Sequence, residues 1–214
     1  MNGLYRRYFK RVLDIVVSAS ALLILSPVLV VVAVLVRVKL GSPVFFSQLR
    51  PGKDEVPFTL YKFRTMAYSD NAPGTQQDDE VRLNAFGRFL RSVSLDELPE
   101  LWNVLRGEMS LVGPRPLLMR YLPYYRETER VRSSVRPGIT GLAQVGGRNA
   151  LTWDERFQAD VEYVTGLSFA LDVKIIVATL VAVLTRKDVL VGSQHVMRDL
   201  DVERREELIE VEAR

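Results

Sequence analysis

The stretch IVVSASALLILSPVLVVVAVLV, residues 15–36, contains no charged side chain and decides how the rest of the chain is placed. As a straight helix it would measure roughly 33 Å, which is enough to cross the hydrocarbon core of a bilayer. The run is too long for the core of a signal peptide, and no small-residue cleavage site follows it. The sequence therefore predicts a membrane segment near the N-terminal end.

A proline inside this run interrupts the helix. Pro27 removes one backbone hydrogen bond at a cost of about 3 kcal/mol, and the hydroxyl of Ser26 can bond a nearby carbonyl and favour a bend. A kinked spanning helix is one interpretation, because membrane helices tolerate proline. Basic residues flank the run on both sides, at Arg6, Arg7, Lys10, Arg11, Arg37 and Lys39. This symmetry favours a re-entrant helix, broken at Ser26-Pro27, that returns to the cytoplasmic face.

The composition narrows the available chemistry. The 214 residues contain no cysteine, which excludes disulfides, thiolate zinc sites and cysteine nucleophiles. The single histidine, His195, lies in a polar segment near the C-terminus, where a solvated side chain is expected. Catalysis therefore has to use Asp, Glu, Lys, Arg, Tyr or a cation held by oxygen ligands. The net charge of +3 indicates an anionic partner, and the absence of any nucleic-acid-binding motif favours lipid or phosphorylated substrate over nucleic acid.

Residues 42–66, SPVFFSQLRPGKDEVPFTLYKFRTM, predict a small β-hairpin. Two apolar-aromatic runs flank a polar turn that contains Pro51-Gly52. Strand alternation places Lys62 and Arg64 on one face and Tyr61 and Phe63 on the other. The two cations form either a solvated strand face or a platform for phosphates.

Helical periodicity accounts for much of the remaining chain. The predicted core-facing residues are Leu83, Phe86 and Leu90 in residues 81–93, and Leu98, Leu101, Trp102 and Leu105 in a helix that ends near Gly107. Thr152 and Glu155 predict a capping box for a helix over residues 151–164. The apolar residues 169–184 are too few to span a bilayer and are expected on the membrane surface or in the core.

Three segments carry weaker patterns. Residues 69–79 are polar and residues 136–149 are punctuated by glycines, so both are expected to be irregular loops. Residues 199–214 predict a charged, solvated helix. The expected organisation is a basic N-terminus with the membrane helix at residues 1–39, a cytoplasmic catalytic domain at residues 40–190 and a charged tail at residues 191–214.

The stretch SLDELPELWNVLRGEMSLVGPRP, residues 94–116, carries the candidate chemistry. Ser94 and Glu97 fit a capping box, and Asp96 as N-cap is the alternative that places Pro99 in the first turn. In either case Asp96 lies at the positive end of a helix, where it should stay ionised and where a phosphate would find donors. This arrangement suits a nucleophilic aspartate attacking phosphorus, with the adjacent glutamate for acid-base work.

Arg115 stands between two prolines, which restrict the backbone on both sides of it. A stiff loop loses little entropy on binding, and the planar guanidinium matches phosphate oxygens in a bidentate manner. Arg115 is therefore either a structural residue of the loop or a phosphate clamp.

These motifs together resemble the bacterial sugar transferase family, and in particular the small monotopic phosphoglycosyl transferases. The resemblance rests on KRVLDIVVSASALLILSPV, SPVFFSQLRPG, YKFRTM, SLDELPELWNVLRGEMSLVGPRPLL and RPGITGLAQVGGRNALTWDERFQADVEYV, in this order. It implies an α+β, predominantly helical fold with an N-terminal re-entrant membrane helix, a small β-hairpin and surface-lying amphipathic helices. The chain resembles the minimal form of the family, without the large N-terminal membrane region of longer relatives.

The resemblance also implies a reaction and its residues. A phospho-sugar moves from a UDP-sugar to undecaprenyl phosphate with release of UMP, at the cytoplasmic face of the bacterial inner membrane. Asp96 is then the nucleophile that forms a covalent aspartyl phospho-sugar, Glu97 the acid-base residue, and both carboxylates bind Mg²⁺. The expected phosphate-binding residues are Arg115, Lys62 and Arg64, and the expected nucleotide-sugar-binding residues are Arg136, Gln144, Arg148 and Asn149. Leu142 and Gly146 depart from the Trp and Asn that family members commonly carry.

Two alternatives remain open. A membrane-anchored, non-catalytic interaction module would use the carboxylates only as caps and the basic residues to bind phospholipid. A direct glycosyl transferase would leave both phosphates on the nucleotide and release UDP. A homo-oligomer is compatible with all of these interpretations.

Overall fold

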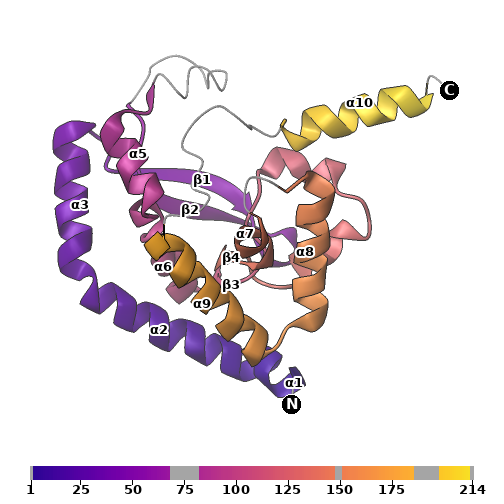
Figure 1. The fold of residues 1–214 in the computed structure, drawn as a ribbon, viewed down its shortest axis with the longest axis horizontal. Coiled ribbons are helices and arrows are strands. Elements are labelled where there is room, and N and C mark those ends of the chain that lie inside the picture. Colours follow the sequence, from indigo (N-terminus) through magenta and orange to yellow (C-terminus); the bar gives the residue numbers. More distant parts are fainter. Residues whose placement is uncertain (1, 68–81, 148–150, 186–197, 213–214) are drawn as a thin grey trace.

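The computed structural model describes residues 2–67, 82–147, 151–185 and 198–212. The predicted polar loop at residues 69–79 and His195 lie outside the described residues. The prediction of a predominantly helical chain with a small antiparallel hairpin is confirmed (Figure 1).

The described residues form the following elements. The helices are α1 (Asn2–Leu4), α2 (Lys10–Ile24), α3 (Ser26–Lys39), α5 (Ala85–Ser92), α6 (Glu100–Arg106), α7 (Leu142–Gly146), α8 (Trp153–Gly166), α9 (Phe169–Thr185) and α10 (Leu200–Glu212). The strands are β1 (Phe45–Pro51), β2 (Pro57–Phe63), β3 (Ser110–Val112) and β4 (Gly138–Thr140). Tyr5–Phe9 is a π-helix, and 3-10 turns occur at Lys53–Glu55, Leu95–Glu97, Met119–Tyr124 and Glu129–Ser134.

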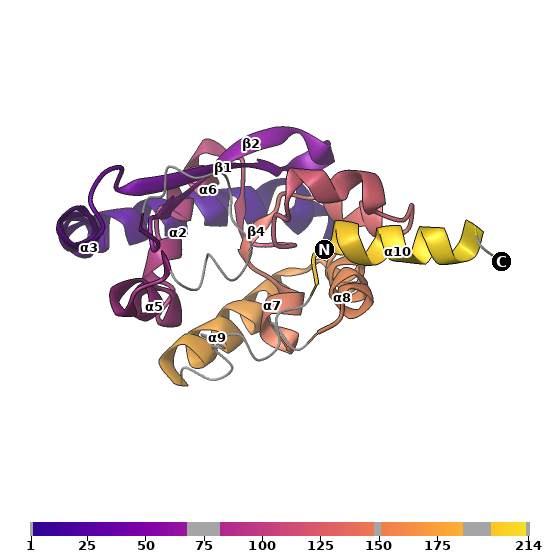
Figure 2. The ribbon, with the colours of Figure 1, turned by 90° about the horizontal axis from the view of Figure 1, so that it is seen from above.

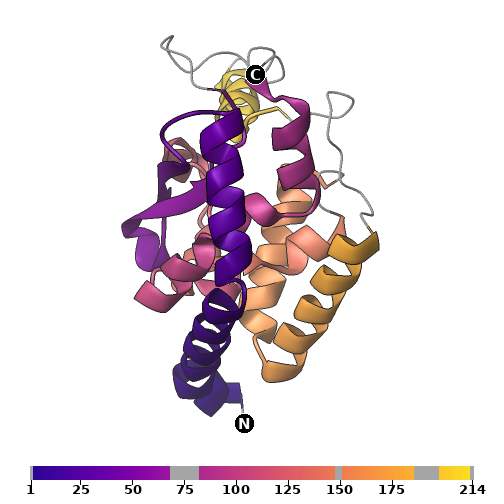
Figure 3. The same ribbon diagram turned by 90° about the vertical axis from the view of Figure 1, so that its left-hand side faces the viewer.

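The N-terminal helices α2 and α3 are separated at Leu25, which confirms the predicted break. The hydroxyl of Ser26 donates to the carbonyl of Leu23 at 2.8 Å, and Pro27 stands in the first turn of α3. The segments Tyr5–Ile24 and Ser26–Lys39 meet at 63°. In Figure 1, α2 forms the lower margin of the molecule and α3 the left-hand margin, and in Figure 3 the two run one above the other on the side that faces the viewer. No single helix in the described ranges is long and apolar enough to cross a membrane. The bent pair taken together has the length and composition to do so.

The packing of α2 reverses the usual arrangement of polar and apolar side chains. Its buried residues are Asp14 and Ser18. The exposed apolar residues of α2 and α3 include Val12, Val16, Leu23, Ile24, Val30, Val31, Val34 and Val38. Patches of this kind on a surface mark contact with another protein or with a membrane.

Polar side chains attach α2 to the rest of the chain. The Asp14 carboxylate accepts hydrogen bonds from the Ser110 hydroxyl and the Leu111 amide, both at 3.0 Å. Arg11 donates to the carbonyls of Val104 and Leu105 at the end of α6, at 2.6 and 2.8 Å. The Val104 carbonyl also accepts from the Gly107 amide at 3.0 Å, and Leu105 lies in the last turn of α6, where carbonyls lack a donor from a following turn. The helix is therefore joined to α6 and β3 by directed bonds.

The hairpin pairs β1 and β2 in the register Phe45 to Phe63 through Pro51 to Pro57. Phe58 and Leu60 pack with Val104 and Met109, which joins β2 to α6 and to the residues after it. Figure 2 shows the hairpin on one side of the molecule and α9 on the opposite side. The helix α6 ends at Gly107, whose φ of 85° is the left-handed conformation that glycine adopts most readily, as predicted.

Several sequence predictions differ from the structure. Trp102, expected to face the core, is 52% exposed, because helical spacing identifies an apolar face but not what covers it. Residues 136–149, expected to be irregular, contain β4 and the short helix α7 in their described part. β4 pairs in parallel with β3, and at Gly138 a side chain would come within 2.1 Å of the Gly113 nitrogen, so glycine there permits close contact rather than a loop.

The C-terminal half confirms one prediction and corrects another. Thr152 and Glu155 form the predicted capping box at the start of α8. The predicted solvated tail is in contact with the body of the molecule at its first turns, where Leu200 and Arg204 are buried. Arg204 pairs with Glu129 at 2.8 Å and with Asp154 at 2.7 Å, partners that local charge patterning could not reveal.

We predict that Asp14→Leu lowers the free energy of unfolding by about 1–3 kcal/mol, because the Ser110 hydroxyl and the Leu111 amide would lose their acceptor. Asp14→Asn keeps one acceptor oxygen and serves as the matched control, with a smaller loss expected. Chemical denaturation of the purified chain in detergent micelles measures both. Equal stability of the leucine variant and the wild type would contradict this account of how α2 is attached.

Candidate active site

The segment that carries the candidate carboxylates is a 3-10 turn, Leu95–Glu97, and not the first turn of a helix. Ser94 has a φ of 55° and its side chain makes no capping bond, so the predicted capping box is wrong. The alternative with Asp96 as N-cap is also wrong, because α6 begins at Glu100 with Pro99 in the cap position. Local spacing suggested a cap, but tertiary partners take the Glu97 side chain.

Glu97 connects two cations from distant parts of the chain. Its Oε1 accepts from Lys62 Nζ on β2 and from Arg115 Nη2 in the loop after β3, each at 2.6 Å. Burial by itself would raise the pKa of Glu97, but Arg115 and Lys62 outweigh it and hold that pKa well below its usual range. The Glu97 carboxylate in turn raises the pKa of Arg115. The structure thus brings two predicted site residues, Lys62 and Arg115, together around a third, the ionised Glu97.

A second carboxylate, Glu100, lies beside this group and was missed by the sequence analysis. It is 2% exposed, and its Oε1 is 3.1 Å from Lys62 Nζ. Burial and the Glu97 charge raise the pKa of Glu100 to about 7. One lysine therefore faces two carboxylates, of which Glu100 is the one that gains a proton first. Its spacing of four residues from Asp96 was the available signal.

Asp96 is 8% exposed and lies next to this charged group. Within the described residues its carboxylate makes no hydrogen bond or ion pair, unlike Glu97. Burial and then Glu97 raise the pKa of Asp96, whereas Lys62, Arg91 and Arg115 oppose the rise. A carboxylate of this kind has its lone pairs available to a substrate phosphorus or a cation.

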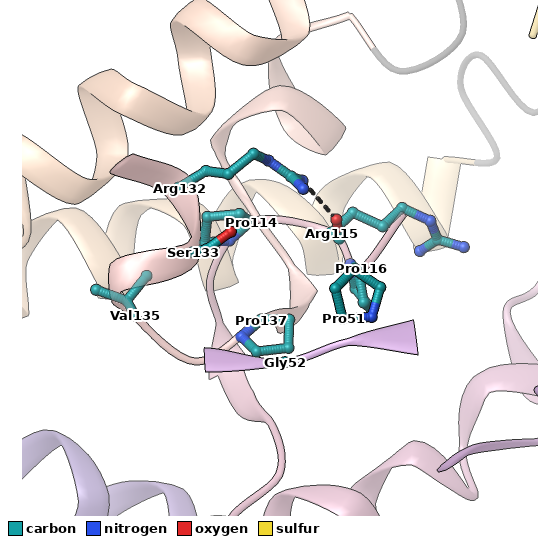
Figure 4. A pocket seen from close by; sticks show the side chains of 9 residues that line it. All are labelled: Pro51, Gly52, Pro114, Arg115, Pro116, Arg132, Ser133, Val135 and Pro137. Atoms are coloured by element: carbon teal, nitrogen blue, oxygen red, sulfur yellow. Dashed lines mark hydrogen bonds between the residues drawn. The ribbon is translucent and has the colours of Figure 1, made fainter. Parts of the chain in front are cut away.

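The loop that presents Arg115 is fixed by its backbone. Arg132 donates to the Arg115 carbonyl at 2.6 Å, and Arg50 donates to the Pro116 carbonyl at 3.1 Å. The amide of Gly138 donates to the Pro114 carbonyl at 3.0 Å. Figure 4 shows Arg115, its two flanking prolines and Arg132 among the residues that line a small cavity. Its volume is about 10 Å³, about the room that one water needs. The predicted stiffness of this loop thus comes from its neighbours as well as from its prolines.

Two further arginines lie near Arg115 and were not predicted. Burial lowers the pKa of Arg50 on β1 to about 10 and also lowers that of Arg156 on α8, and the Arg115 charge contributes to both shifts. Positive charges that come close enough to affect one another form a region that favours an anion. No spacing in the sequence connects these residues, because they come from a strand, a loop and a helix.

The other predicted binding residues have different partners. Arg64 follows the end of β2 and donates to the carbonyls of Leu40 and Ser42. Arg136 donates to the Gly107 carbonyl at 2.8 Å, and Gln144 donates to the Ile139 carbonyl at 2.8 Å. These bonds attach each side chain to backbone rather than to the carboxylate group. Arg148 and Asn149 lie outside the described residues.

The fit of the carboxylates to Mg²⁺ can be tested from the donor set. In the part of the chain that the structure describes, no group of three or more acidic or histidine side chains is placed to hold a metal ion by itself. Mg²⁺ usually keeps several waters and takes one or two carboxylates together with substrate phosphates. Asp96, with free carboxylate oxygens, fits that kind of shared site, with Glu97 as the second carboxylate.

Comparisons with known proteins agree on one family. A family model described as bacterial sugar transferase matches residues 5–186. An uncharacterized sugar transferase, EpsL, of Bacillus subtilis is 50% identical over 180 residues, covering 84% of this chain and 89% of the relative. Two further relatives are named UDP-glucose:undecaprenyl-phosphate glucose-1-phosphate transferase. The one from Caulobacter vibrioides is 40% identical over 186 residues, covering 82% of this chain and 70% of the relative. The one from Klebsiella pneumoniae is 41% identical over 189 residues, covering 84% of this chain and 40% of the relative. The chain spans most of the first two relatives but less than half of the third.

We predict that Glu100 makes stability depend on pH. The pKa of a glutamate in the unfolded chain is about 4.3, whereas in the folded chain the pKa of Glu100 is about 7. The folded state therefore binds more protons in this range, and the free energy of unfolding falls as pH rises from about 4.3 to about 7, by up to about 3 kcal/mol. Denaturation measured at several pH values should show a smaller fall in Glu100→Gln, because other buried carboxylates such as Asp96 also have a raised pKa, whereas the exposed Glu162→Gln should retain the full fall. The same pH dependence in both variants would show that Glu100 is not the group responsible.

Proposed function

Because the chain belongs to the bacterial sugar transferase family, we propose that it transfers a sugar 1-phosphate from a UDP-sugar to undecaprenyl phosphate and releases UMP. The names of the relatives from Caulobacter and Klebsiella support this class of reaction. The observation that carries the proposal in this chain is the buried Asp96 carboxylate beside the cations Lys62 and Arg115. A nucleophile and the means to offset phosphate charge lie within one small region.

In the first step, a carboxylate oxygen of Asp96 attacks the phosphorus that carries the sugar. A bond forms between that oxygen and phosphorus, and the bond from phosphorus to the oxygen bridging the two phosphates breaks. UMP leaves with the bridging oxygen and its electron pair. The product is an aspartyl phospho-sugar, and Lys62 and Arg115 offset the negative charge on the phosphate oxygens during the exchange.

In the second step, a phosphate oxygen of undecaprenyl phosphate attacks the same phosphorus. The new bond joins the two phosphates, the bond to the Asp96 oxygen breaks, and the free carboxylate is restored. If the acceptor phosphate carries a proton, that proton has to leave as the bond forms. Glu97 is the proposed acceptor of this proton because it is adjacent to Asp96 in the chain.

The low pKa of Glu97 determines at which stage of the reaction its carboxylate can accept a proton. While Lys62 and Arg115 both bond to it, the carboxylate is a weak base, and its effect is to orient the two cations. Substrate phosphates compete for the same two cations. As the cations turn to the phosphates, the pKa of Glu97 rises, and the carboxylate becomes able to take up a proton when the acceptor has arrived.

Mg²⁺ is part of the proposal. Asp96 and Glu97 would hold it together with the phosphates of the donor, and the ion would supply positive charge that neutralises the pyrophosphate. We predict that chelation with EDTA abolishes UMP release and that added Mg²⁺ restores it. Titration calorimetry should detect Mg²⁺ binding far more strongly with a UDP-sugar present than without it. Tight binding of the ion to the chain alone would contradict a site shared with the substrate.

The proposed location is the cytoplasmic face of the bacterial inner membrane, with α2 and α3 as a re-entrant pair. The reversed packing of α2, in which polar residues are buried and valines and leucines are exposed, supports contact with lipid. α9 has a further exposed apolar face at Val177, Leu180, Val181 and Leu184. A lipid acceptor and a water-soluble donor meet only at such an interface.

The decisive experiment is a product assay. Purified protein receives Mg²⁺, undecaprenyl phosphate and a panel of UDP-sugars, and the released nucleotide is identified by chromatography. We predict UMP release with at least one donor, lowered by about a thousandfold or more in Asp96→Asn because the attacking oxygen is lost. Asp54→Asn, in the exposed turn of the hairpin, is the matched control and should retain full activity. Mass spectrometry of wild type with donor alone should find the phospho-sugar on the Asp96 peptide.

The other outcomes identify the alternatives. Release of UDP would indicate direct glycosyl transfer, in which the nucleotide keeps both phosphates. Absence of any product across a broad panel, from protein that unfolds cooperatively, would favour a membrane-anchored interaction module. Full activity of Asp96→Asn would exclude Asp96 as the nucleophile.

A further inference from the structure

An apolar groove of about 470 Å³ lies at the break between α2 and α3. Leu22 comes from α2, Leu29 and Val30 come from α3, and the hairpin contributes Tyr61 and Phe63 on the opposite wall. Pro99 and Trp102, before and within α6, complete the groove. Its size is within the range of small-molecule sites, and its lining is composed almost entirely of carbon atoms.

The groove and the charged group of the candidate active site are built on the same parts of the chain. Tyr61 immediately precedes Lys62, and Pro99 immediately precedes Glu100, so the same two segments contribute to both. Side chains on β2 alternate, and Lys62 faces Glu97 while Phe63 packs in the apolar cluster that contains Val32 and Val36.

The turn with Asp96 joins these two environments. Leu95 packs against the apolar cluster of Phe63, and Glu97 bonds to Lys62. Asp96 stands between them in the chain. It therefore lies at the border between an apolar region and a cationic region, where a molecule with a hydrocarbon chain and a phosphate would have each part in a matching environment.

We propose that this groove, which Ala33 and Phe45 also line, binds the part of the acceptor's hydrocarbon chain that lies next to its phosphate. The proposal rests on the proposed function, because it identifies the acceptor as a lipid phosphate. Exposed apolar residues of the helix break, among them Leu23 and Ile24, lie beside the groove in the chain, and a hydrocarbon chain can enter from that side.

Two neighbouring valines on α3 provide a matched test. Val30 lines the groove and is 62% exposed, whereas Val31 is 57% exposed and does not line it. Val30→Trp should fill part of the groove and Val31→Trp should not. Loss of burial for about two methylene groups of the acceptor corresponds to a roughly tenfold rise in the KM for the lipid phosphate. We expect this rise in Val30→Trp only, with an unchanged KM for the UDP-sugar in both variants.

A second variant guards against misfolding. Trp102→Ala removes a half-exposed side chain from the groove wall without opening the core, and it should also raise the KM for the acceptor. The first half-reaction separates the two proposals, because UMP release from donor alone requires Asp96 but no acceptor. An intact UMP burst with equal acceptor KM values in all three variants and wild type would overturn the groove and leave the proposed function standing.

Cross-linking tests the groove without catalysis. A polyprenyl phosphate with a diazirine near its phosphate is irradiated with wild-type protein in phosphatidylcholine nanodiscs. We expect labelled peptides that contain Val30 or Trp102, and labelling that unmodified polyprenyl phosphate prevents. If excess phosphatidylcholine prevents the labelling equally well, the groove is a phospholipid site and the proposal is overturned. Labelling confined to α9 would overturn it too. If wild type shows no UMP burst, the proposed function fails, and this labelling still decides whether the groove binds a lipid phosphate.

Discussion

The candidate active site depends on the pair of 2.6 Å bonds through which Glu97 holds Lys62 and Arg115 together. Two cations that face the same small region repel each other, and water screens that repulsion only in part, because the Lys62 side chain is 16% exposed and that of Arg115 is 41% exposed. Glu97 offsets this repulsion and fixes both side chains in one place. Removal of Glu97 would leave the two cations without the carboxylate that they share, and the cost is greater at Lys62, the less exposed of the two. The carboxylate is therefore a structural requirement before any chemical step.

The two cations are held in place from different directions. Lys62 belongs to a strand whose apolar side chains pack against Val104 and Met109, so its backbone is fixed by the core. Arg115 belongs to a loop that Arg132 and Arg50 hold through carbonyl oxygens. Since the strand, the turn with Glu97 and the loop are far apart in sequence, the site exists only in the folded chain. Because the cations bond to Glu97, the carboxylate oxygens of Asp96 keep lone pairs that are available to a substrate.

Features with a local cause could be predicted from the sequence. The break at Ser26-Pro27, the hairpin, the helix end at Gly107 and the Thr152 capping box each depend on a few adjacent residues. Prediction failed where tertiary partners decided the outcome, as at Glu97, which bonds to distant cations instead of capping its own turn. Arg50 and Arg156 had no pattern that connected them to the site, and for Glu100 the available signal was its spacing of four residues from Asp96. Trp102 fitted an apolar helical face, but spacing alone cannot tell a protein core from a groove.

The helix α2 links the exposed apolar surface of the α2–α3 pair to the candidate active site. Arg11 and Asp14 on α2 bond to the end of α6 and the start of β3, and the other faces of α2 are apolar and exposed. The carboxylates lie just before α6, and Arg115 lies just after β3. Directed bonds therefore connect α2 to both segments that carry the chemistry. If α2 lies in the lipid interface, the depth of α2 sets the height of Asp96 above the hydrocarbon. The reason is that the hydrogen bonds of Arg11 and Asp14 fix the position of α2 relative to the segments around Asp96. An acceptor phosphate at headgroup level would then reach the carboxylate without leaving the membrane.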